Sequence, residues 1–266
     1  MSLEQTFRTA KADGRAALVG YLPAGFPTVQ GGIDAIKVMV DAGCDVIEIG
    51  LPYSDPVMDG PTIQAAALQA LEGGVRTRDV LATVEAVAAT GVQTLVMTYW
   101  NPIERYGVER FAADFASAGG VGLITPDLVP DEAGEWLAAS SKHGLDRIFL
   151  VAPSSTDERL RMTCEHASGF VYAAAVMGVT GARETSSDLA EPLVARTRAV
   201  TDLPVGVGIG VSNGAQAAVV AGFADGVIVG SAFVRALLDN AGDDKAAHAA
   251  LRALTEDLAA GVRGNA

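Results

Sequence analysis

The sequence contains few of the residues from which metal sites and disulfides are built. Among its 266 residues are two cysteines, Cys44 and Cys164, which lie far apart in apolar or helical surroundings. We expect two free buried thiols in a reducing, cytoplasmic compartment rather than a disulfide. With only three histidines and neither an HExxH nor a CxxC spacing, the sequence argues against a zinc site.

Basic residues are also scarce, because 19 lysines and arginines stand against 32 acidic residues and the formal net charge is −13. Such a protein offers no basic surface to a nucleic acid. No apolar run reaches membrane-spanning length, and the polar start MSLEQTFRTAKADGR is not that of a signal peptide. We therefore expect a protein that binds neither nucleic acid nor membrane.

Short apolar runs alternate with helical patterns along the sequence. The runs are almost continuous in apolar residues, as is typical of parallel strands that are covered on both faces. They predict strands over 17–22, 45–51, 93–99, 121–125, 147–152, 170–175, 204–209 and 225–230. The patterns between them predict helices over 31–42, 61–72, 77–90, 108–118, 131–143, 156–166, 188–200, 213–221 and 231–240, with an N-terminal helix at about 3–13 and a C-terminal helix at about 244–260.

Eight strands that alternate with helices predict one (β/α)8 barrel domain, a TIM barrel, over residues 1–266. A doubly wound open sheet is the alternative architecture. In both, ligands bind at the carboxyl ends of the strands, so the loops that follow the strands, such as 51–60 and 99–107, hold the candidate site.

The second predicted strand carries one carboxylate, Glu48, in an apolar setting. Alternation places Val46, Glu48 and Gly50 on one face, which is the interior in a barrel. Loss of water there raises the pKa of a carboxyl group toward neutrality, as suits a general acid/base. The alternative is a structural salt bridge to a neighbouring strand. The other strands contain few basic residues, which favours the catalytic interpretation.

The next loop carries Asp55 and Asp59 in the stretch LPYSDPVMDGP. Either acid could form a turn or cap the helix that begins near Pro61. Prolines and glycines stiffen this loop, and it directly follows the strand of Glu48. That position favours a shared site for Asp59 and Glu48, whereas nothing raises Asp55 above a turn residue.

Glycines cluster in two stretches late in the sequence, VGVGIGVSNG at 205–214 and VGSAF at 229–233. In barrels the loops after strands seven and eight often bind phosphate, with backbone N–H groups and a helix N-terminus as donors. Such a site needs no lysine, which fits an acidic protein. The alternative is that these glycines permit tight packing, but their position favours phosphate.

GVSNG at 210–214 also matches the G-x-S-x-G pattern of hydrolases, with His248 downstream. That histidine lies in a charged helical segment, so we expect Ser212 to be a helix cap instead. The long polar loop 177–188 is either a lid over the site or an ordinary surface loop. Tyr21 and Tyr172 lie in strands and either line a pocket or belong to the core.

EIGLPYSDPVMDGPTIQ at 48–64 closely resembles the signature of the tryptophan synthase alpha subunit family. The resemblance continues, in order, through YLPAGFP at 21–27, MTYWNPI at 97–103, LITPDLVP at 123–130, VMGVTGAR at 176–183, VGVGIGVS at 205–212 and ADGVIVGSAFV at 224–234. It covers almost the whole sequence. It implies a TIM-barrel lyase that cleaves indole-3-glycerol phosphate to indole and glyceraldehyde 3-phosphate for tryptophan biosynthesis.

The resemblance also implies a partner. Members of the family pass indole to a beta subunit that holds pyridoxal phosphate (PLP), in an alpha2beta2 complex, and the alpha subunit itself holds no cofactor. Loop 51–60 and its neighbours, including Pro52 and Asp55, would face the beta subunit. Two alternatives are a lyase that works without a partner and a barrel that mainly activates one.

The resemblance assigns roles to individual residues. Glu48 matches the family's acid/base, and Asp59 matches the acid that interacts with the indole N–H. Thr180 matches a threonine that closes over the site and bonds this aspartate. Tyr21 and Ile209 stand where phenylalanine is common, and Tyr172 matches a pocket tyrosine. Phosphate would bind backbone groups near Gly181, Gly210, Gly230 and Ser231.

Overall fold

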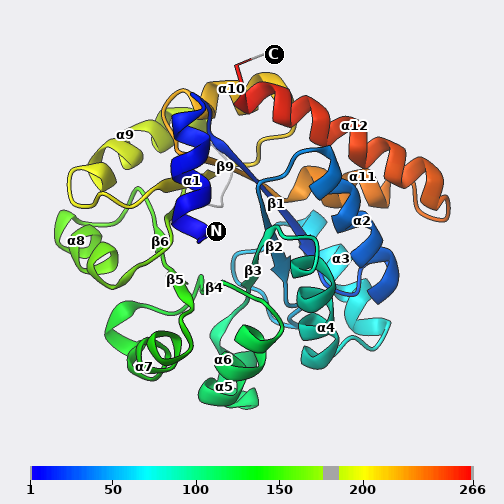
Figure 1. Cartoon of the computed structure of the whole chain (residues 1–266), viewed down its shortest axis with the longest axis horizontal. Coiled ribbons are helices and arrows are strands. Elements are labelled where there is room, and N and C mark those ends of the chain that lie inside the picture. The colour runs from blue at the N-terminus through cyan, green and yellow to red at the C-terminus, as the bar shows by residue number, and fades with distance from the viewer. Residues whose placement is uncertain (1, 176–185, 265–266) are drawn as a thin grey trace.

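The computed structural model describes residues 2–175 and 186–264, and in these residues nine parallel strands form one nearly closed barrel surrounded by helices (Figure 1). The strands are β1 (Ala17–Pro23), β2 (Val46–Gly50), β3 (Gln93–Met97), β4 (Gly122–Ile124), β5 (Asp146–Ile148), β6 (Leu150–Val151), β7 (Val171–Ala174), β8 (Val205–Gly208) and β9 (Gly226–Val229). Their order in the sheet is β5-β4-β3-β2-β1-β9-β8-β7-β6.

The described helices surround the barrel, and the first of them covers one of its ends. They are α1 (Leu3–Ala12), α2 (Val29–Ala42), α3 (Pro61–Glu72), α4 (Thr77–Ala88), α5 (Trp100–Tyr106), α6 (Val108–Ser117), α7 (Gly134–His143), α8 (Asp157–His166), α9 (Ser186–Arg198), α10 (Gly214–Ala221), α11 (Ser231–Leu238) and α12 (Asp244–Val262), with a 3-10 turn at Pro130–Glu132. Among the described residues, no helix is long and apolar enough to cross a membrane.

The predicted barrel is confirmed, and the open sheet is wrong. The two ends of the strand order, β5 and β6, are consecutive in the sequence and are separated only by Phe149. All eight predicted strand regions form strands, but the fifth divides in two. β5 pairs with β4 and β6 pairs with β7, so the backbone changes partners at Phe149, which is buried.

Helix α5 is a correction to the predicted loop 99–107. The expected third strand continues to residue 99, whereas β3 ends at Met97 and Trp100 begins a helix. Pro102 lies in the first turn of α5, where a missing N–H costs no helical hydrogen bond. The Asp127 carboxylate accepts the Trp100 N–H at 2.9 and 3.1 Å and so helps to start the helix.

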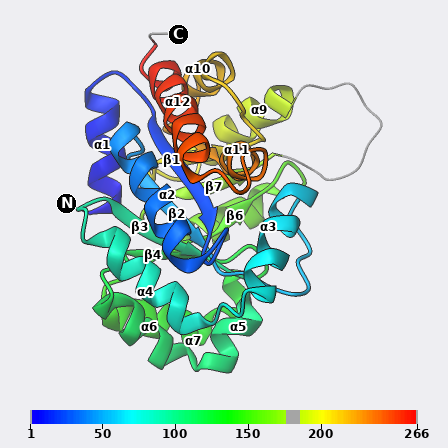
Figure 2. The ribbon, with the colours of Figure 1, turned by 90° about the vertical axis from the view of Figure 1, so that its right-hand side faces the viewer.

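The barrel interior is closed at one end by α1. Phe7 of α1 packs against Phe170 with ring centroids 5.0 Å apart. Gly226 leaves room for this ring, because a Cβ at that position would lie 2.6 Å from Phe7 Cε1. Figure 2 shows α1 on one side of the barrel and α3 on the other. The amino ends of the strands are therefore plugged, and a ligand must enter at the carboxyl ends.

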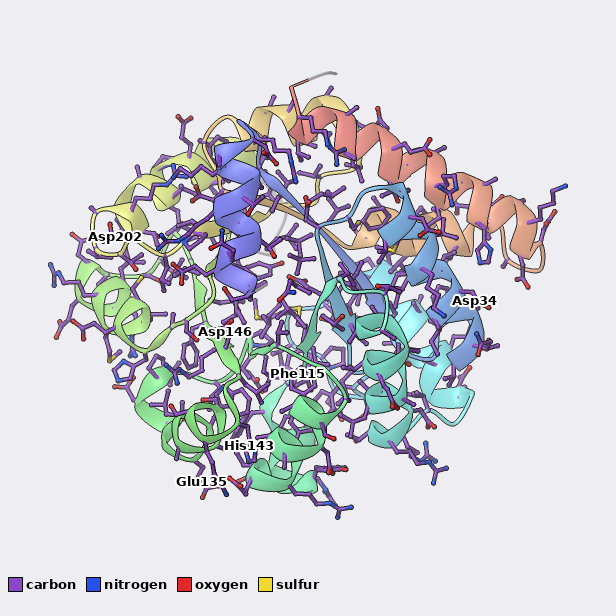
Figure 3. The ribbon with its side chains drawn as sticks, in the orientation of Figure 1. Asp34, Phe115, Glu135, His143, Asp146 and Asp202 are labelled. Carbon is purple, nitrogen blue, oxygen red and sulfur yellow. The ribbon has the colours of Figure 1, made fainter. Side chains whose placement is uncertain are left out.

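The outer layer separates apolar from charged residues. Phe115 of α6 is fully buried, and Gly120 makes room for its ring. Glu135 and Asp202, by contrast, are exposed at the rim of the molecule (Figure 3). Most of the acidic surplus of such a protein lies outside, so an acid inside the barrel needs a separate explanation.

Candidate active site

Glu48 lies in the middle of β2, between Tyr21 of β1 and Leu95 of β3 in the strand register. It faces the interior together with Val46, as alternation predicts, and it is only 1% exposed. Among the described residues, Glu48 Oε1 has no hydrogen-bond partner. Burial raises the pKa of Glu48 to about 8, and no cation among the described residues acts on it. The structural salt bridge is thus not supported, and the carboxyl group is largely protonated at pH 7.

The raised pKa of Glu48 costs folding stability. A carboxyl group that ionises at about pH 4.5 when solvated stays protonated in the barrel up to about pH 8. Between these two values the unfolded state releases the proton and the folded state does not, so the free energy of unfolding falls as pH rises. The penalty at pH 7 is on the order of 3 kcal/mol. A buried acid kept at this cost is typical of a functional site.

Two tyrosines occupy the interior beside Glu48, and glycines make room for them. A Cβ at Gly50 would lie 2.1 Å from the hydroxyl of Tyr21, and one at Gly208 would lie 2.4 Å from that of Tyr172. Gly230 also borders the Tyr21 ring, since its Cβ would lie 3.3 Å from Cδ1. The structure therefore places both predicted pocket tyrosines over backbone at the carboxyl end of the barrel.

The electrostatics of Tyr21 connect the two acids. Burial raises the pKa of the Tyr21 phenol, and the negative charges of Asp59 and then Glu48 raise it further. The pKa of Tyr172 is raised by burial, then by the charge of Glu48 and by Tyr21. Both carboxylates therefore act on one phenol, that of Tyr21, which supports the prediction that Glu48 and Asp59 share a site.

Asp59 ends the loop between β2 and α3 and is half-buried. The hydroxyl of Tyr99 donates a hydrogen bond to Asp59 Oδ1 at 3.2 Å. Burial raises the pKa of Asp59, and the bond from Tyr99 opposes that rise. The N-cap of α3 is Gly60, and no side chain caps this helix, so the capping role considered for Asp59 is wrong. Asp55 is exposed and accepts a hydrogen bond from the Ser54 hydroxyl.

The glycine-rich carboxyl ends of β8 and β9 form another part of the mouth of the barrel. Gly210 has a φ of +80°, a left-handed conformation that favours glycine. Helix α11 begins at Ser231 with Gly230 as its N-cap. No side chain forms a capping hydrogen bond with its first N–H groups, which can therefore bind an anion. Ile209 is half-buried and packs against the larger hydrophobic cluster. The predicted Thr180 and Gly181 lie outside the described residues.

The nucleophile pattern around Ser212 has another explanation. Its N–H and hydroxyl both donate to Gln216 Oε1, at 2.8 and 3.0 Å. The predicted cap is wrong, because Asn213 caps α10 by accepting the Gln216 N–H at 2.9 Å. The hydroxyl of Ser212 is thus committed to Gln216, and no described histidine is bonded to it.

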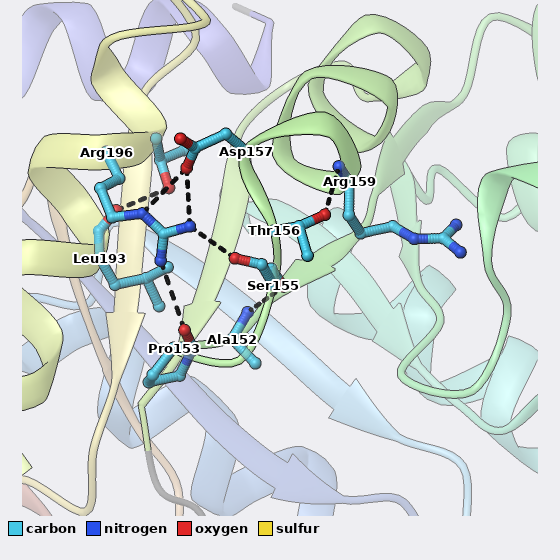
Figure 4. Close-up of polar contacts among 9 residues, drawn as sticks. Ala152, Pro153, Ser155, Thr156, Asp157, Arg159, Leu193 and Arg196 are labelled. Atoms are coloured by element: carbon cyan, nitrogen blue, oxygen red, sulfur yellow. Dashed lines mark hydrogen bonds and ion pairs between the residues drawn. The ribbon is translucent and has the colours of Figure 1, made fainter.

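Two residues of the rim were not assigned from the sequence. Arg196 of α9 donates to the carbonyls of Pro153 and Ser155 and pairs with Asp157, which fastens the loop after β6 to α9 (Figure 4). Tyr99 is the other, with its bond to Asp59. Tyr99 lies two residues after Met97, whose side chain packs in the barrel interior. Strand alternation therefore predicts that Tyr99 also points inward, toward the site.

Comparison with known proteins agrees with this geometry. The family model described as tryptophan synthase alpha chain matches residues 7–263. The protein is 67% identical over 257 residues to the tryptophan synthase alpha chain of Salinispora arenicola, covering 97% of this chain and 96% of that protein. It is 62% identical over 261 residues to that of Nocardia farcinica, covering 98% and 96%.

Solved structures show the same fold. Tryptophan synthase from M. tuberculosis in an aminoacrylate-bound form gives a TM-score of 0.90 at 56% identity, covering 98% of this chain and 100% of that one. Tryptophan synthase subunit alpha from Legionella pneumophila gives 0.90 at 33% identity, covering 99% of each. The protein therefore belongs to the tryptophan synthase alpha chain family, lyases that cleave indole-3-glycerol phosphate.

Proposed function

We propose that Glu48 moves the protons in the cleavage of indole-3-glycerol phosphate and that Asp59 stabilises the charge that develops. The observation that supports this most is the buried Glu48 carboxyl group, which has a pKa of about 8 and no cationic partner in the described part of the protein. A group with this pKa is protonated often enough to act as an acid near neutral pH, and its conjugate base is strong enough to take a proton back.

The chemistry begins and ends with a proton on Glu48. That proton goes to C3 of the indole ring, and the positive charge falls on the ring nitrogen. The bond from C3 to the adjoining carbon of the glycerol phosphate tail breaks, and its electron pair returns to the ring to give neutral indole. As the hydroxyl group on that carbon becomes a carbonyl, its proton passes to the Glu48 carboxylate. The products are indole and glyceraldehyde 3-phosphate.

Asp59 faces the charge that this sequence of steps creates. A carboxylate beside the ring N–H stabilises the cationic intermediate in a site from which water is excluded. The Asp59 carboxylate lies at the mouth of the barrel and shares the space around Tyr21 with Glu48. An indole ring that spans this space meets Glu48 at C3 and Asp59 at its nitrogen.

The other predicted residues complete the pocket. Tyr21, Tyr172 and Ile209 provide its apolar walls. The phosphate binds to backbone N–H groups near Gly181, Gly210, Gly230 and Ser231, supported by the open first turn of α11. The family resemblance assigns to Thr180 the role of closing over the site and bonding Asp59. The indole ring itself accepts the electron pair, so the cleavage needs no cofactor in this subunit.

The partner is a beta subunit that holds PLP and uses the indole for tryptophan synthesis, in an alpha2beta2 complex. Loop 51–60 fits this role because Val57 and Met58 are 78% and 50% exposed beside Asp55. Apolar residues on an exposed loop at the mouth of a site are typical of an interaction surface. Cys44 and Cys164 are free and buried, which fits a reducing cytoplasm.

Release of indole from indole-3-glycerol phosphate by the purified protein tests this function. We expect release by the protein alone and faster release when a beta subunit is added. Rapid turnover that a beta subunit leaves unchanged would favour a lyase without a partner. No release under either condition would contradict the lyase assignment. Ser212→Ala serves as the control for a hydrolase and should retain activity.

A further inference from the structure

One phenol, that of Tyr99, contacts two consecutive residues of the loop that carries Asp59. Between Pro52 and Asp59 the two prolines donate no N–H, and Val57 and Met58 are largely exposed. Here the Met58 N–H donates to the Tyr99 hydroxyl at 3.0 Å. The same hydroxyl contacts Asp59 Oδ1 at 3.2 Å. Tyr99 therefore holds Met58 and Asp59 in a loop whose residues Ser54, Asp55 and Val57 are exposed.

Tyr99 is itself rigidly placed. It lies two residues after the end of β3, occupies the N-cap position of α5 and is only 5% exposed. Its ring packs against that of Tyr53 with centroids 5.3 Å apart, and the Tyr53 hydroxyl accepts a bond from Asn101 Nδ2 at 3.2 Å. An aromatic residue locked by packing on a strand end gives its hydroxyl a fixed position.

The direction of the bond to Asp59 follows from counting protons. A tyrosine hydroxyl has one proton and can also accept. The Met58 N–H can only donate, so it takes an acceptor position on the oxygen. The single proton of Tyr99 is then free to point at Asp59, whose ionised carboxylate can only accept. Such a bond stabilises the ionised form of Asp59.

We propose that Tyr99 is a positioning residue for Asp59, holding its carboxylate ionised and oriented toward the indole nitrogen by a hydrogen bond that the phenol donates. This rests on the role proposed for Asp59 above. Among the described residues, Tyr99 is the only one whose side chain donates a hydrogen bond to this carboxylate.

The pH dependence of cleavage distinguishes this role from a purely structural one. The groups near Asp59 are Tyr99, Tyr21 and, across Tyr21, Glu48, while Tyr53 lies behind the Tyr99 ring. Burial raises the pKa of Asp59, and Tyr99 opposes it. Without the hydroxyl the pKa rises further, so a higher pH is needed to ionise Asp59.

The test compares the full-length protein with Tyr99→Phe and Tyr106→Phe, measuring kcat/KM for indole release from about pH 5 to about pH 9. Tyr106→Phe is the matched control, since it removes a phenol that donates to Asp114 Oδ2 at 2.6 Å rather than to Asp59. We expect Tyr99→Phe to move the acidic limb to higher pH, with a loss of about tenfold at low pH and recovery near the optimum. Tyr106→Phe should follow the unchanged protein.

A profile of Tyr99→Phe that superimposes on that of the unchanged protein would overturn the inference. So would an equal loss at every pH with unmoved limbs, which marks a structural role. Carbon-13 NMR of labelled aspartate, assigned with Asp59→Asn, tests the same point without activity, because the Asp59 signal should titrate at higher pH in Tyr99→Phe. If Asp59→Asn itself is nearly as active as the unchanged protein, the proposed function fails rather than this inference alone.

Discussion

Glu48→Gln should lower kcat for indole release by about 10²- to 10⁴-fold, the usual contribution of a positioned acid/base. Glutamine has nearly the same shape as a protonated glutamic acid, so it keeps the pocket, but it can neither give up a proton to C3 nor take one from the hydroxyl. Because Glu48 is 1% exposed, water cannot easily replace it. Substrate affinity should remain nearly unchanged.

Steady-state kinetics and calorimetric binding of indole-3-glycerol phosphate measure the two quantities separately. Glu135→Gln is the matched control, because it makes the same substitution at an exposed rim position (Figure 3). It should leave both kcat and affinity as they are. Turnover of Glu48→Gln near the rate of the unchanged protein would remove Glu48 from the reaction.

Asp59→Asn should lower kcat by about 10²- to 10³-fold, as expected when one stabilising group is lost from a developing charge. The amide keeps the size of the residue and can still contact the Tyr99 hydroxyl, but it carries no charge to oppose the cation on the indole nitrogen. The effect should appear mainly in kcat, since neutral indole in the substrate gains less from the carboxylate than the cation does.

The measurement is the same indole assay, with Asp202→Asn as the control. Asp202 is exposed after α9, away from the mouth of the barrel, so its neutral variant should behave as the unchanged protein. If Asp59→Asn loses no more activity than this control, Asp59 is only a turn residue.

The sequence predicts the barrel because its strands are covered on both faces. Apolar runs such as those of β2 and β9 carry few polar residues, and Glu48 is conspicuous there for that reason. Alternation then places it inside, and burial accounts for its raised pKa. A single acid in an otherwise apolar strand can therefore be recognised from the composition of the strand and from the alternation of its side chains.

Other features of the fold and the site depend on long-range or local contacts that hydrophobic periodicity and composition do not reveal. Tyr99 and Asp59 are forty residues apart in the sequence and meet only because β2 and β3 are neighbours. Helix α5 starts at a bond from Trp100 to Asp127, another long-range pair. The cap of α10 is Asn213 rather than Ser212, since two adjacent residues fit the same pattern and local geometry decides between them.

The titration of the Glu48 carboxyl group tests the central claim most directly. Carbon-13 NMR of the protein labelled at glutamate, with Glu48→Gln to assign the signal, follows this one group as pH rises. Burial predicts an ionisation at about pH 8, well above the ordinary value of 4.5. A Glu48 signal that titrates near 4.5 would show a solvated, permanently ionised carboxylate, and the proton transfer to indole described above would lose its donor.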